Sequence, residues 1–341
     1  MPKIDKNCIK SILESVTFKI DTINLQYHKT ITLNIFHSIN DFSSTKKTIL
    51  TLGTFDGVHI GHKKILEKLI LSTQSNQYES LVLTFFPHPR MVLQEKSEIK
   101  LLNTIPEKIN LLDGIGIQNL VIHPFDETFS RLTAEDFVSN ILVDQFRIHK
   151  IIIGHDHRFG RNRTADINDL IGFGEKYGFE VEQISVQELN SISVSSTKVR
   201  KAIDEGDMAL ANSYLGYDYF VTGTVVKGQQ LGRTIGFPTA NIKVKEEYKL
   251  IPLNGVYVVK SILNGETVYG IMNNGHKPTV GEHALSIEVH FLNYKDDLYD
   301  QEITVSILHF IRSEHKFDSL ELLKEQIQKD KNQALAYISS L

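Results

Sequence analysis

Short apolar segments alternate with helical patterns across residues 48–205, and this alternation constrains the fold more than any other feature of the chain. The apolar segments are predicted to be buried strands, and they lie at 49–52, 81–86, 119–122, 151–153 and 180–184. Helical patterns separate them, and Thr133 starts one with a carboxylate three residues later. Strands separated in this way are typical of a doubly wound parallel sheet. Ligands bind such sheets beyond the carboxyl ends of the strands, so the residues that follow each strand are the candidates for a site.

The pattern changes near Gly216, where apolar residues begin to alternate with a period of two. This alternation predicts strands at 220–226, 256–259, 267–272, 285–294 and 302–311. Asn264-Gly265 is typical of a tight hairpin turn. The run indicates a small antiparallel β-barrel, followed by an amphipathic C-terminal helix over about 319–339. Leu320, Leu323 and Ile327 are expected to face inward from this helix.

Length and composition agree with this two-part organisation. The 341 residues suit about two domains, which we place at 33–216 and 217–341, with residues 1–32 as an extension of unknown role. No run of 18 apolar residues is present, so a transmembrane helix is not expected. The single cysteine, Cys8, cannot form an internal disulfide, which fits a cytoplasmic protein. The formal charge of −4 is not that of a general nucleic-acid binder.

The first candidate site joins the first predicted strand to the helix that follows it. Its sequence is G-T-F-D-G-V-H-I-G-H over residues 53–62. The glycines permit close approach of the backbone, and the start of a helix offers unpaired N–H groups to an anion. His59 and His62 are three residues apart, so they share one face and could donate hydrogen bonds to a polyphosphate. The alternative is an ordinary strand–helix turn with two surface histidines.

A second segment, Ser195 to Arg200, reads S-S-T-K-V-R. Ser195 or Ser196 can cap the next helix, which places Lys198 and Arg200 in its first turn. Cations at this end of a helix oppose the helix dipole, and a bound anion would remove that conflict. Taken alone, the segment is better explained as an ordinary capped helix with solvated basic side chains.

Together, these two segments resemble the nucleotidyltransferase module of bifunctional riboflavin kinase/FAD synthetases. Further matches lie in 84–90, 124–126 and 154–160, and the resemblance covers about residues 33–341. It implies transfer of an adenylyl group from ATP to FMN, which yields FAD and pyrophosphate. Because the FMN phosphate is already an anionic nucleophile, catalysis would depend on alignment and on neutralising charge.

The resemblance also implies roles for individual residues. His59 and His62 would hold the ATP phosphates, with Ser196 and Arg200 closing from the other side. The other nucleotide contacts that it implies are Gly53, Phe55, Gly57, Gly61, Asp156 and Thr197. The flavin pocket would be bordered by Pro87, His88, Pro89 and Phe125. A rigid loop is an equally good explanation of Pro87–Pro89.

A third glycine-dense segment occupies residues 223–241 of the predicted barrel domain. It is not a Walker A motif, because no G-K-[ST] closes it. Its glycines could still form a backbone nest for phosphates. Thr239 and Asn241 are two residues apart, so in extended chain they point the same way, and neutral oxygens suit Mg²⁺. The alternative is a glycine-rich turn that leads into an edge strand.

This segment fits G-x-V-x-x-G-x-x-x-G-R-x-x-G-F-P-T-A-N, which resembles the riboflavin kinase signature. The resemblance implies that Glu288 accepts the proton of the riboflavin 5′-hydroxyl as that oxygen attacks the γ-phosphate of ATP. It implies Mg²⁺ at Thr239 and Asn241. The remaining residues that it implies are Gly228, Gly232 and Arg233 for ATP phosphates and Asn273 and Arg312 for the flavin.

Three positions depart from the family pattern. His157 stands where many members have an aromatic residue, Asn274 replaces a usual aliphatic residue, and Lys277 stands where arginine is frequent. Lysine keeps the charge but loses the planar fork of donors. None of the three is a residue to which the resemblance assigns chemistry, so we expect both activities.

We therefore expect an enzyme that converts riboflavin to FMN and then FMN to FAD, with ATP and Mg²⁺ in both steps. The expected partners are the small molecules riboflavin, FMN and ATP, and neither nucleic acid nor a membrane. One alternative is an adenylyltransferase for another phosphorylated small molecule, with a barrel that is not a kinase. Others are a flavin-binding module with degenerate sites and a nucleic-acid-binding barrel. The sequence leaves the oligomeric state open.

Overall fold

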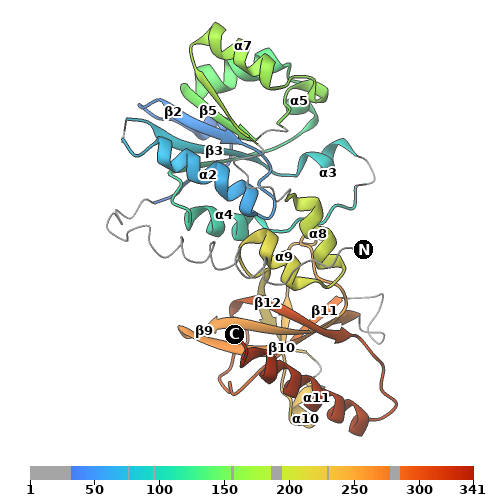
Figure 1. Cartoon of the computed structure of the whole chain (residues 1–341). Helices are drawn as coiled ribbons and strands as arrows, with labels where there is room; N and C mark the ends of the chain where they lie inside the picture. Colours follow the sequence, from blue (N-terminus) through green and yellow to red (C-terminus); the bar gives the residue numbers. More distant parts are fainter. Residues whose placement is uncertain are drawn as a thin grey trace, which may run out of the picture.

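The structure, a computed structural model, describes residues 32–75, 77–94, 97–154, 157–185, 194–228, 230–276 and 285–341. Figure 1 shows its two parts, a sheet flanked by helices and a barrel below it. Both parts agree with the expected architecture. Residues 1–31, nearly the whole of the extension, lie outside the described residues.

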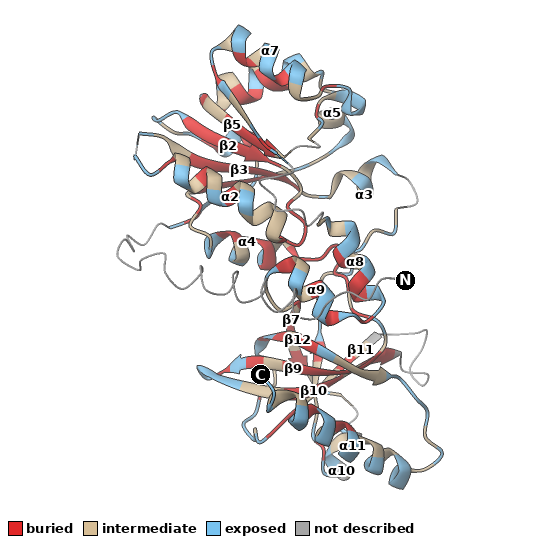
Figure 2. Ribbon diagram, viewed as in Figure 1, coloured by how far each residue is buried: buried red, intermediate tan, exposed pale blue. Residues whose placement is uncertain are grey.

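Six strands of the described chain form the first sheet, in the order β1-β4-β3-β2-β5-β6, and every neighbouring pair is parallel. The strands are β1 (Asn34–Phe36), β2 (Thr48–Leu52), β3 (Glu79–Phe85), β4 (Asn119–His123), β5 (Ile148–Gly154) and β6 (Glu180–Ile184). The central strands are almost wholly buried, as their apolar sequences predict (Figure 2). After β2 the chain builds outward on one side through β3 and β4, and then returns to place β5 on the other side. The switch point of the sheet therefore lies between β2 and β5.

Helices connect these strands, and several start at capping side chains that the sequence indicates. They are α2 (Ile60–Ser72), α3 (Pro89–Leu93), α4 (Ile105–Asp113), α5 (Glu127–Ser130), α6 (Ala134–Asp136), α7 (Ile167–Tyr177), α8 (Ser196–Asp204) and α9 (Met208–Leu215). Thr133 caps α6, which continues as a π-helix over Phe137–Gln145. The sequence did not predict helices α3, α5 and α9, nor strand β1.

The second part is a closed antiparallel barrel, in the order β10-β11-β8-β7-β12-β9. Its strands are β7 (Phe220–Val226), β8 (Ala240–Lys243), β9 (Gly255–Leu263), β10 (Glu266–His276), β11 (Leu285–Phe291) and β12 (Glu302–Ser313). The short helix α10 (Leu231–Thr234) lies between β7 and β8. Asn264 and Gly265 join β9 to β10 with φ of 52° and 83°, which confirms the predicted hairpin turn.

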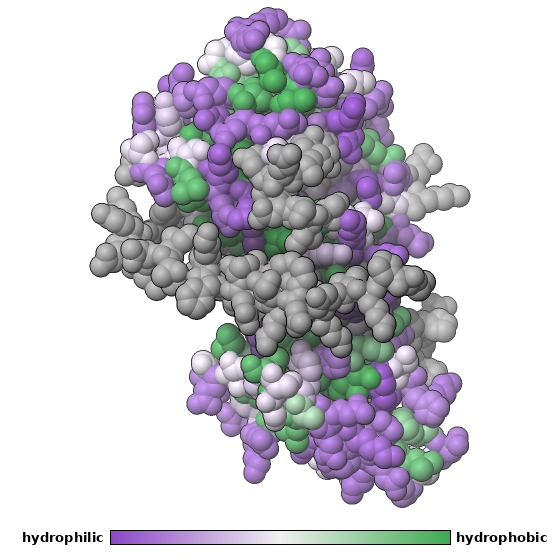
Figure 3. Space-filling view, viewed as in Figure 1, coloured by the Kyte–Doolittle hydropathy of each residue, from purple (hydrophilic) through white to green (hydrophobic). Residues whose placement is uncertain are grey.

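Helix α11 (Leu320–Ile338) packs against the barrel. Leu320, in its first turn, is 59% exposed, so the predicted inward orientation of this residue is wrong. Leu323 and Ile327 are half-buried, and the buried residues Asp330 and Ala334 continue the same stripe of the helix. The Asp330 carboxylate pairs with Arg312 of β12. Hydrophilic side chains cover much of this lower end of the molecule in Figure 3.

One of the hydrophobic clusters contains residues from both parts of the chain. Buried residues of α8 and α9, such as Val199 and Leu215, belong to the same cluster as Val221 and Val259 of the barrel. Leu102, which precedes α4, belongs to it as well. The boundary near residue 216 is therefore a break in chain pattern, whereas the packing runs across it. In the described part of the chain, no helix is long and apolar enough to span a bilayer.

Candidate functional site

The first candidate site is a cavity of about 1040 Å³ at the carboxyl ends of the parallel strands. Leu52 and Gly53 line it from the end of β2, Phe85 from β3 and Gly154 from β5. The first residues of α2 and α8 close it, and Figure 1 shows both helices at this end of the sheet. The cavity thus lies where the switch point predicts a ligand.

His59 and His62 lie at the start of α2 and both line this cavity. The His59 side chain caps the helix, since its Nδ1 accepts a hydrogen bond from the His62 backbone N–H at 3.3 Å. The two rings stack with centroids 3.6 Å apart. Burial, reinforced by the positive fields of His59 and Lys108, holds the pKa of His62 well below its usual value. His62 is therefore neutral near pH 7, and its buried Nδ1 has no hydrogen-bond partner among the described residues.

The segment S-S-T-K-V-R forms the opposite wall, so the structure brings together two motifs that are about 140 residues apart. Ser195, not Ser196, caps α8 by accepting from the Lys198 N–H at 3.3 Å. The Ser196 hydroxyl instead donates to the Asp56 carbonyl at 2.9 Å. Arg200 lines the cavity and forms an ion pair with the Asp56 carboxylate.

Not every predicted residue of the first site reaches the cavity. Phe55 is 2% exposed and packs beneath Gly53, and Gly57 packs against Leu102 and Leu215. Neither lines the cavity, and the expected phosphate contacts of Phe55 and Gly57 stay predictions. Gly53, Gly61, Ser196 and Thr197 do line it. Asp156 lies outside the described residues.

On the predicted flavin side, His88, Pro89 and Phe125 line the cavity. Pro87 is exposed and does not line it, and its place beside the flavin stays a prediction. His88 caps α3 by accepting from the Arg90 N–H at 3.1 Å. Burial, with the cations Arg200, Lys108 and Arg90 nearby, lowers the pKa of His88 to about 4. The imidazole is therefore neutral at physiological pH.

The sequence reading missed most of the positive charge in this cavity. Among the described residues, its lining includes six arginines and a single carboxylate, that of Glu127. The arginines are Arg90, Arg131, Arg158, Arg161, Arg163 and Arg200. Arg158, Arg161 and Arg163 lie close together in the segment 158–163, whereas Arg90, Arg131 and Arg200 lie far from them in the sequence, so no single basic run marks all six. A cavity with this balance suits strongly anionic ligands, although the chain as a whole is acidic.

Lys108 is a second missed residue, and it lies directly beneath the loop at 53–57. Its side chain is buried, and Nζ donates to the Thr54 carbonyl at 2.7 Å. Burial lowers the pKa of Lys108 to about 8, and the nearby Asp56 carboxylate opposes this shift. Lys108 occurs in the middle of a predicted helix, and nothing in the local sequence distinguishes it from a solvated lysine.

The second candidate site lies on the barrel. Glu288 of β11 is directly opposite Asn241 of β8 and Asn273 of β10, so three polar side chains form a row across three strands. Thr239 donates from Oγ1 to Glu288 Oε2 at 3.1 Å. Ile287 and Val289 alternate with Glu288 and point into the barrel core. The row therefore lies on the outer face of the barrel, where its residues are half-buried.

The glycines of the barrel segment are required by packing inside the protein itself. A Cβ at Gly228 would lie 2.4 Å from the Asn241 amide, and one at Gly232 would lie 2.2 Å from the Phe237 carbonyl oxygen. The loop is thereby held against the row that contains Glu288. Arg233 is exposed, and its phosphate role stays a prediction. Arg312 donates to Asp330 through two nitrogens, and its flavin role also stays a prediction.

Comparison with known proteins assigns the family. The model of the FAD synthetase family matches residues 41–198, and that of the riboflavin kinase family matches residues 215–338. A curated relative from Listeria monocytogenes, named bifunctional riboflavin kinase/FMN adenylyltransferase, is 36% identical over 315 residues, which cover 92% of this chain and 99% of the relative. This chain belongs to the bifunctional riboflavin kinase/FMN adenylyltransferase family. The comparisons thus confirm the family that the sequence motifs indicated.

Other relatives of the same name agree. The one from Buchnera aphidicola is 39% identical and covers 86% of this chain and 94% of its own length, and that from Escherichia coli K12 is 37% identical and covers 83% and 90%. A solved structure named as a macrolide-efflux protein from Streptococcus pneumoniae aligns with a TM-score of 0.78 at 26% identity, covering 88% of this chain and 97% of that one. That name describes the other protein, and the family models carry the assignment here.

Two of the three departures from the pattern of the riboflavin kinase/FMN adenylyltransferase family fall in described parts of the chain. Asn274 is completely buried, and its Nδ2 donates to the Pro252 carbonyl at 2.6 Å, while its Oδ1 has no hydrogen-bond partner among the residues that the structure describes. His157 lines the first cavity and lies 6.2 Å from the Phe159 ring. Lys277 lies outside the described residues.

Proposed function

We propose that this chain makes FMN and then FAD at two separate sites, with the residues described above in defined roles. As a member of its family it is a transferase with riboflavin kinase and FMN adenylyltransferase activities. ATP, riboflavin, FMN and FAD are its substrates and products. The observation that carries the residue-level proposal is that the segments 53–62 and 195–200 line one arginine-rich cavity.

In the first site, His59 and His62 bind the phosphates of ATP. A neutral His62 donates through one ring nitrogen, so binding does not require the costly protonation of a buried imidazole. Thr197, Ser196 and Arg200 approach from the opposite wall. The arginines of the lining stabilise the charge that develops on the α-phosphate and on the pyrophosphate leaving group. His88, Pro89 and Phe125 border FMN, whose phosphate attacks.

In the second site, Glu288 removes the proton from the 5′-hydroxyl of riboflavin. The Thr239 hydroxyl holds this carboxylate in place by its hydrogen bond, and Asn241 and Asn273 flank it. Hydroxyl and amide oxygens beside one carboxylate fit a hard cation, so Thr239 and Asn241 would hold Mg²⁺. The ion would neutralise charge on the transferred phosphoryl group. Gly228, Gly232 and Arg233 contact the ATP phosphates, and Asn273 and Arg312 the flavin.

The division into 33–216 for adenylyl transfer and 217–341 for the kinase is part of the same proposal, as is a cytoplasmic location, which the single cysteine fits.

One incubation tests the whole proposal. Purified chain, riboflavin, ATP and Mg²⁺ are sampled over time, and riboflavin, FMN and FAD are separated by chromatography. We expect FMN to appear first and FAD to follow with release of pyrophosphate. Formation of FMN without FAD would refute the adenylyltransferase role of the first site. A lack of riboflavin conversion would refute the kinase role of the second site. FAD formed only from FMN that is added directly would show that the barrel is not a kinase.

A further inference from the structure

The loop that carries the histidines of the first site has a backbone conformation that is unfavourable by itself. Phe55 and Val58 have φ of 45° and 35°, in the left-handed region that side chains other than glycine rarely adopt. Such a conformation persists only where surrounding contacts impose it. The contacts that impose this one are therefore part of the adenylylation site, even where they are far from the cavity.

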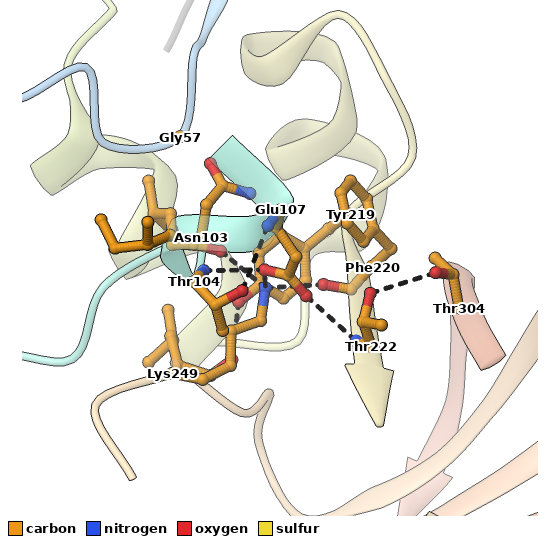
Figure 4. Close-up of polar contacts among 12 residues, drawn as sticks. Gly57, Asn103, Thr104, Glu107, Tyr219, Phe220, Thr222, Lys249 and Thr304 are labelled. Atoms are coloured by element: carbon orange, nitrogen blue, oxygen red, sulfur yellow. Dashed lines mark hydrogen bonds and ion pairs between the residues drawn. The ribbon is translucent and has the colours of Figure 1, made fainter. Parts of the chain in front are cut away.

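One chain of contacts that supports the loop starts in the barrel part of the molecule. Lys249 is completely buried, and Nζ donates to Glu107 Oε2 at 2.6 Å, to the Leu102 carbonyl at 2.7 Å and to the Phe220 carbonyl at 2.7 Å. Figure 4 shows these three bonds converging on one nitrogen. An ammonium group has three protons, so its donors are fully used by partners from both parts of the chain.

Two hydrogen bonds then lead from Lys249 to the loop. Leu102, whose carbonyl accepts from Lys249, donates its own N–H to Asp56 Oδ1 at 2.9 Å. The other carboxylate oxygen of Asp56 pairs with Arg200, which lines the cavity. Asp56 is 1% exposed, so this carboxylate is fixed inside the protein. Lys249 thereby supports a loop residue and a cavity residue at once.

A second path runs through α4. One carboxylate oxygen of Glu107 accepts a hydrogen bond from Lys249 Nζ, and the other accepts from the Thr222 N–H of β7 at 3.0 Å. The next residue, Lys108, donates to the Thr54 carbonyl in the loop at 2.7 Å. The same turn of helix thus binds the barrel on one side and the loop on the other. The buried ion pair of Lys249 with Glu107 thereby connects the barrel to the helix that supports the loop.

We propose that Lys249, in the kinase part of the chain, is a positioning residue for adenylyl transfer. With Glu107 it holds the loop at 53–58 in its left-handed conformation, and so aligns the histidine pair. Its three hydrogen bonds reach none of Glu288, Thr239 or Asn241, so the kinase site does not depend on it. The proposal rests on the adenylyltransferase role assigned to the first cavity.

The test is Lys249→Met in the full chain, assayed for both reactions in one sample well below its melting temperature. Kinase activity measures the folded fraction, so the ratio of FAD formation from FMN to FMN formation from riboflavin is independent of protein loss. Misplacement of aligned groups lowers rate strongly, and we expect this ratio to fall about tenfold to a hundredfold. The loss should lie in kcat and in KM for ATP of adenylyl transfer alone, whereas a merely structural role would leave both constants of the folded fraction unchanged.

Lys260→Met is the matched control. Lys260 belongs to the same barrel and pairs with Asp218 at 2.7 Å, but none of its described contacts reaches the loop. Its ratio should stay within about twofold of that of the unaltered chain, which is the scatter expected of distant sites. An equal fall of the ratio in Lys260→Met would refute a specific role for Lys249.

Tyr217→Phe keeps the proposal falsifiable if Lys249→Met does not fold. Its hydroxyl donates to the Gly57 carbonyl at 2.8 Å, so this variant removes one support of the same loop without a buried charge. We expect a fall of the ratio of about threefold or more, the usual effect of one lost hydrogen bond. An unchanged ratio in Lys249→Met, or in Tyr217→Phe where the former is insoluble, overturns the proposal. Failure of the unaltered chain to form FAD would overturn instead the function of the first cavity.

Discussion

Glu288→Gln separates the two activities in a single substitution. The amide is nearly isosteric with the carboxylate, and its oxygen can still accept from Thr239 Oγ1, which lies 3.1 Å from Glu288 Oε2. The neighbours across the sheet, Asn241 and Asn273, carry no charge that would change its fit. The substitution therefore removes basicity and little else. A general base contributes about 10²- to 10⁴-fold, or about 3–5 kcal/mol of transition-state stabilisation, so FMN formation should fall by this factor.

The assay follows both conversions separately. Riboflavin with ATP and Mg²⁺ reports the kinase, and FMN with ATP and Mg²⁺ reports adenylyl transfer, each by chromatography of the flavins. Because Glu288 lies on the barrel and the cavity on the sheet, FAD formation from added FMN should stay within about twofold of the unaltered rate. A kinase that keeps more than a tenth of its rate would refute the role of Glu288 as base. An equal loss of both activities would refute the two-site account.

Three further predictions concern the adenylylation site, the barrel core and the metal. His59→Ala with His62→Ala should reduce FAD formation by about a hundredfold or more and let FMN accumulate, since phosphate contacts are lost, and undiminished FAD would contradict this. Asn274→Asp would bring a buried carboxylate against the Pro252 carbonyl, which now accepts from the amide at 2.6 Å. It should lower the free energy of unfolding by about 3 kcal/mol or more in a thermal melt, and an unchanged melting temperature would count against this packing. Chelation with EDTA should stop both reactions until Mg²⁺ is restored, whereas persistent turnover would exclude the ion.

The residues of the first site were predictable to the extent that they form local patterns. The pairs His59–His62 and Ser195–Ser196 lie within recognisable motifs, and the alternation of strands and helices predicts that both motifs lie beyond strand ends. The structure brings them into one cavity. Asp56 carried a usable signal, since a carboxylate inside a loop expected to bind phosphate needs a cationic partner. That partner is Arg200.

Other residues carried no local signal. Lys108 and Lys249 read as ordinary lysines in the sequence, yet both are buried and bind oxygens that lie far along the chain. The lining arginines are spread along the chain from Arg90 to Arg200. Leu320 belongs by spacing to the inward-facing stripe of α11, and Leu323 and Ile327 of that stripe are half-buried, but Leu320 itself is 59% exposed. Periodicity predicts the inward face of a helix, whereas the length of that face which is covered depends on the packing.

The sequence by itself determined the class of each half, the positions of most of its strands and the chemistry of its motifs, because periodicity and turn residues act over a few neighbouring positions. It did not predict β1 and β8. Only the tertiary structure decided which motifs share a cavity, which charges are buried and how the halves are joined. Burial and pairing depend on residues brought together by the packed core, such as Lys249 with Glu107, which are 142 positions apart. Distance along the chain carries no information about such contacts until the core that contains them has formed.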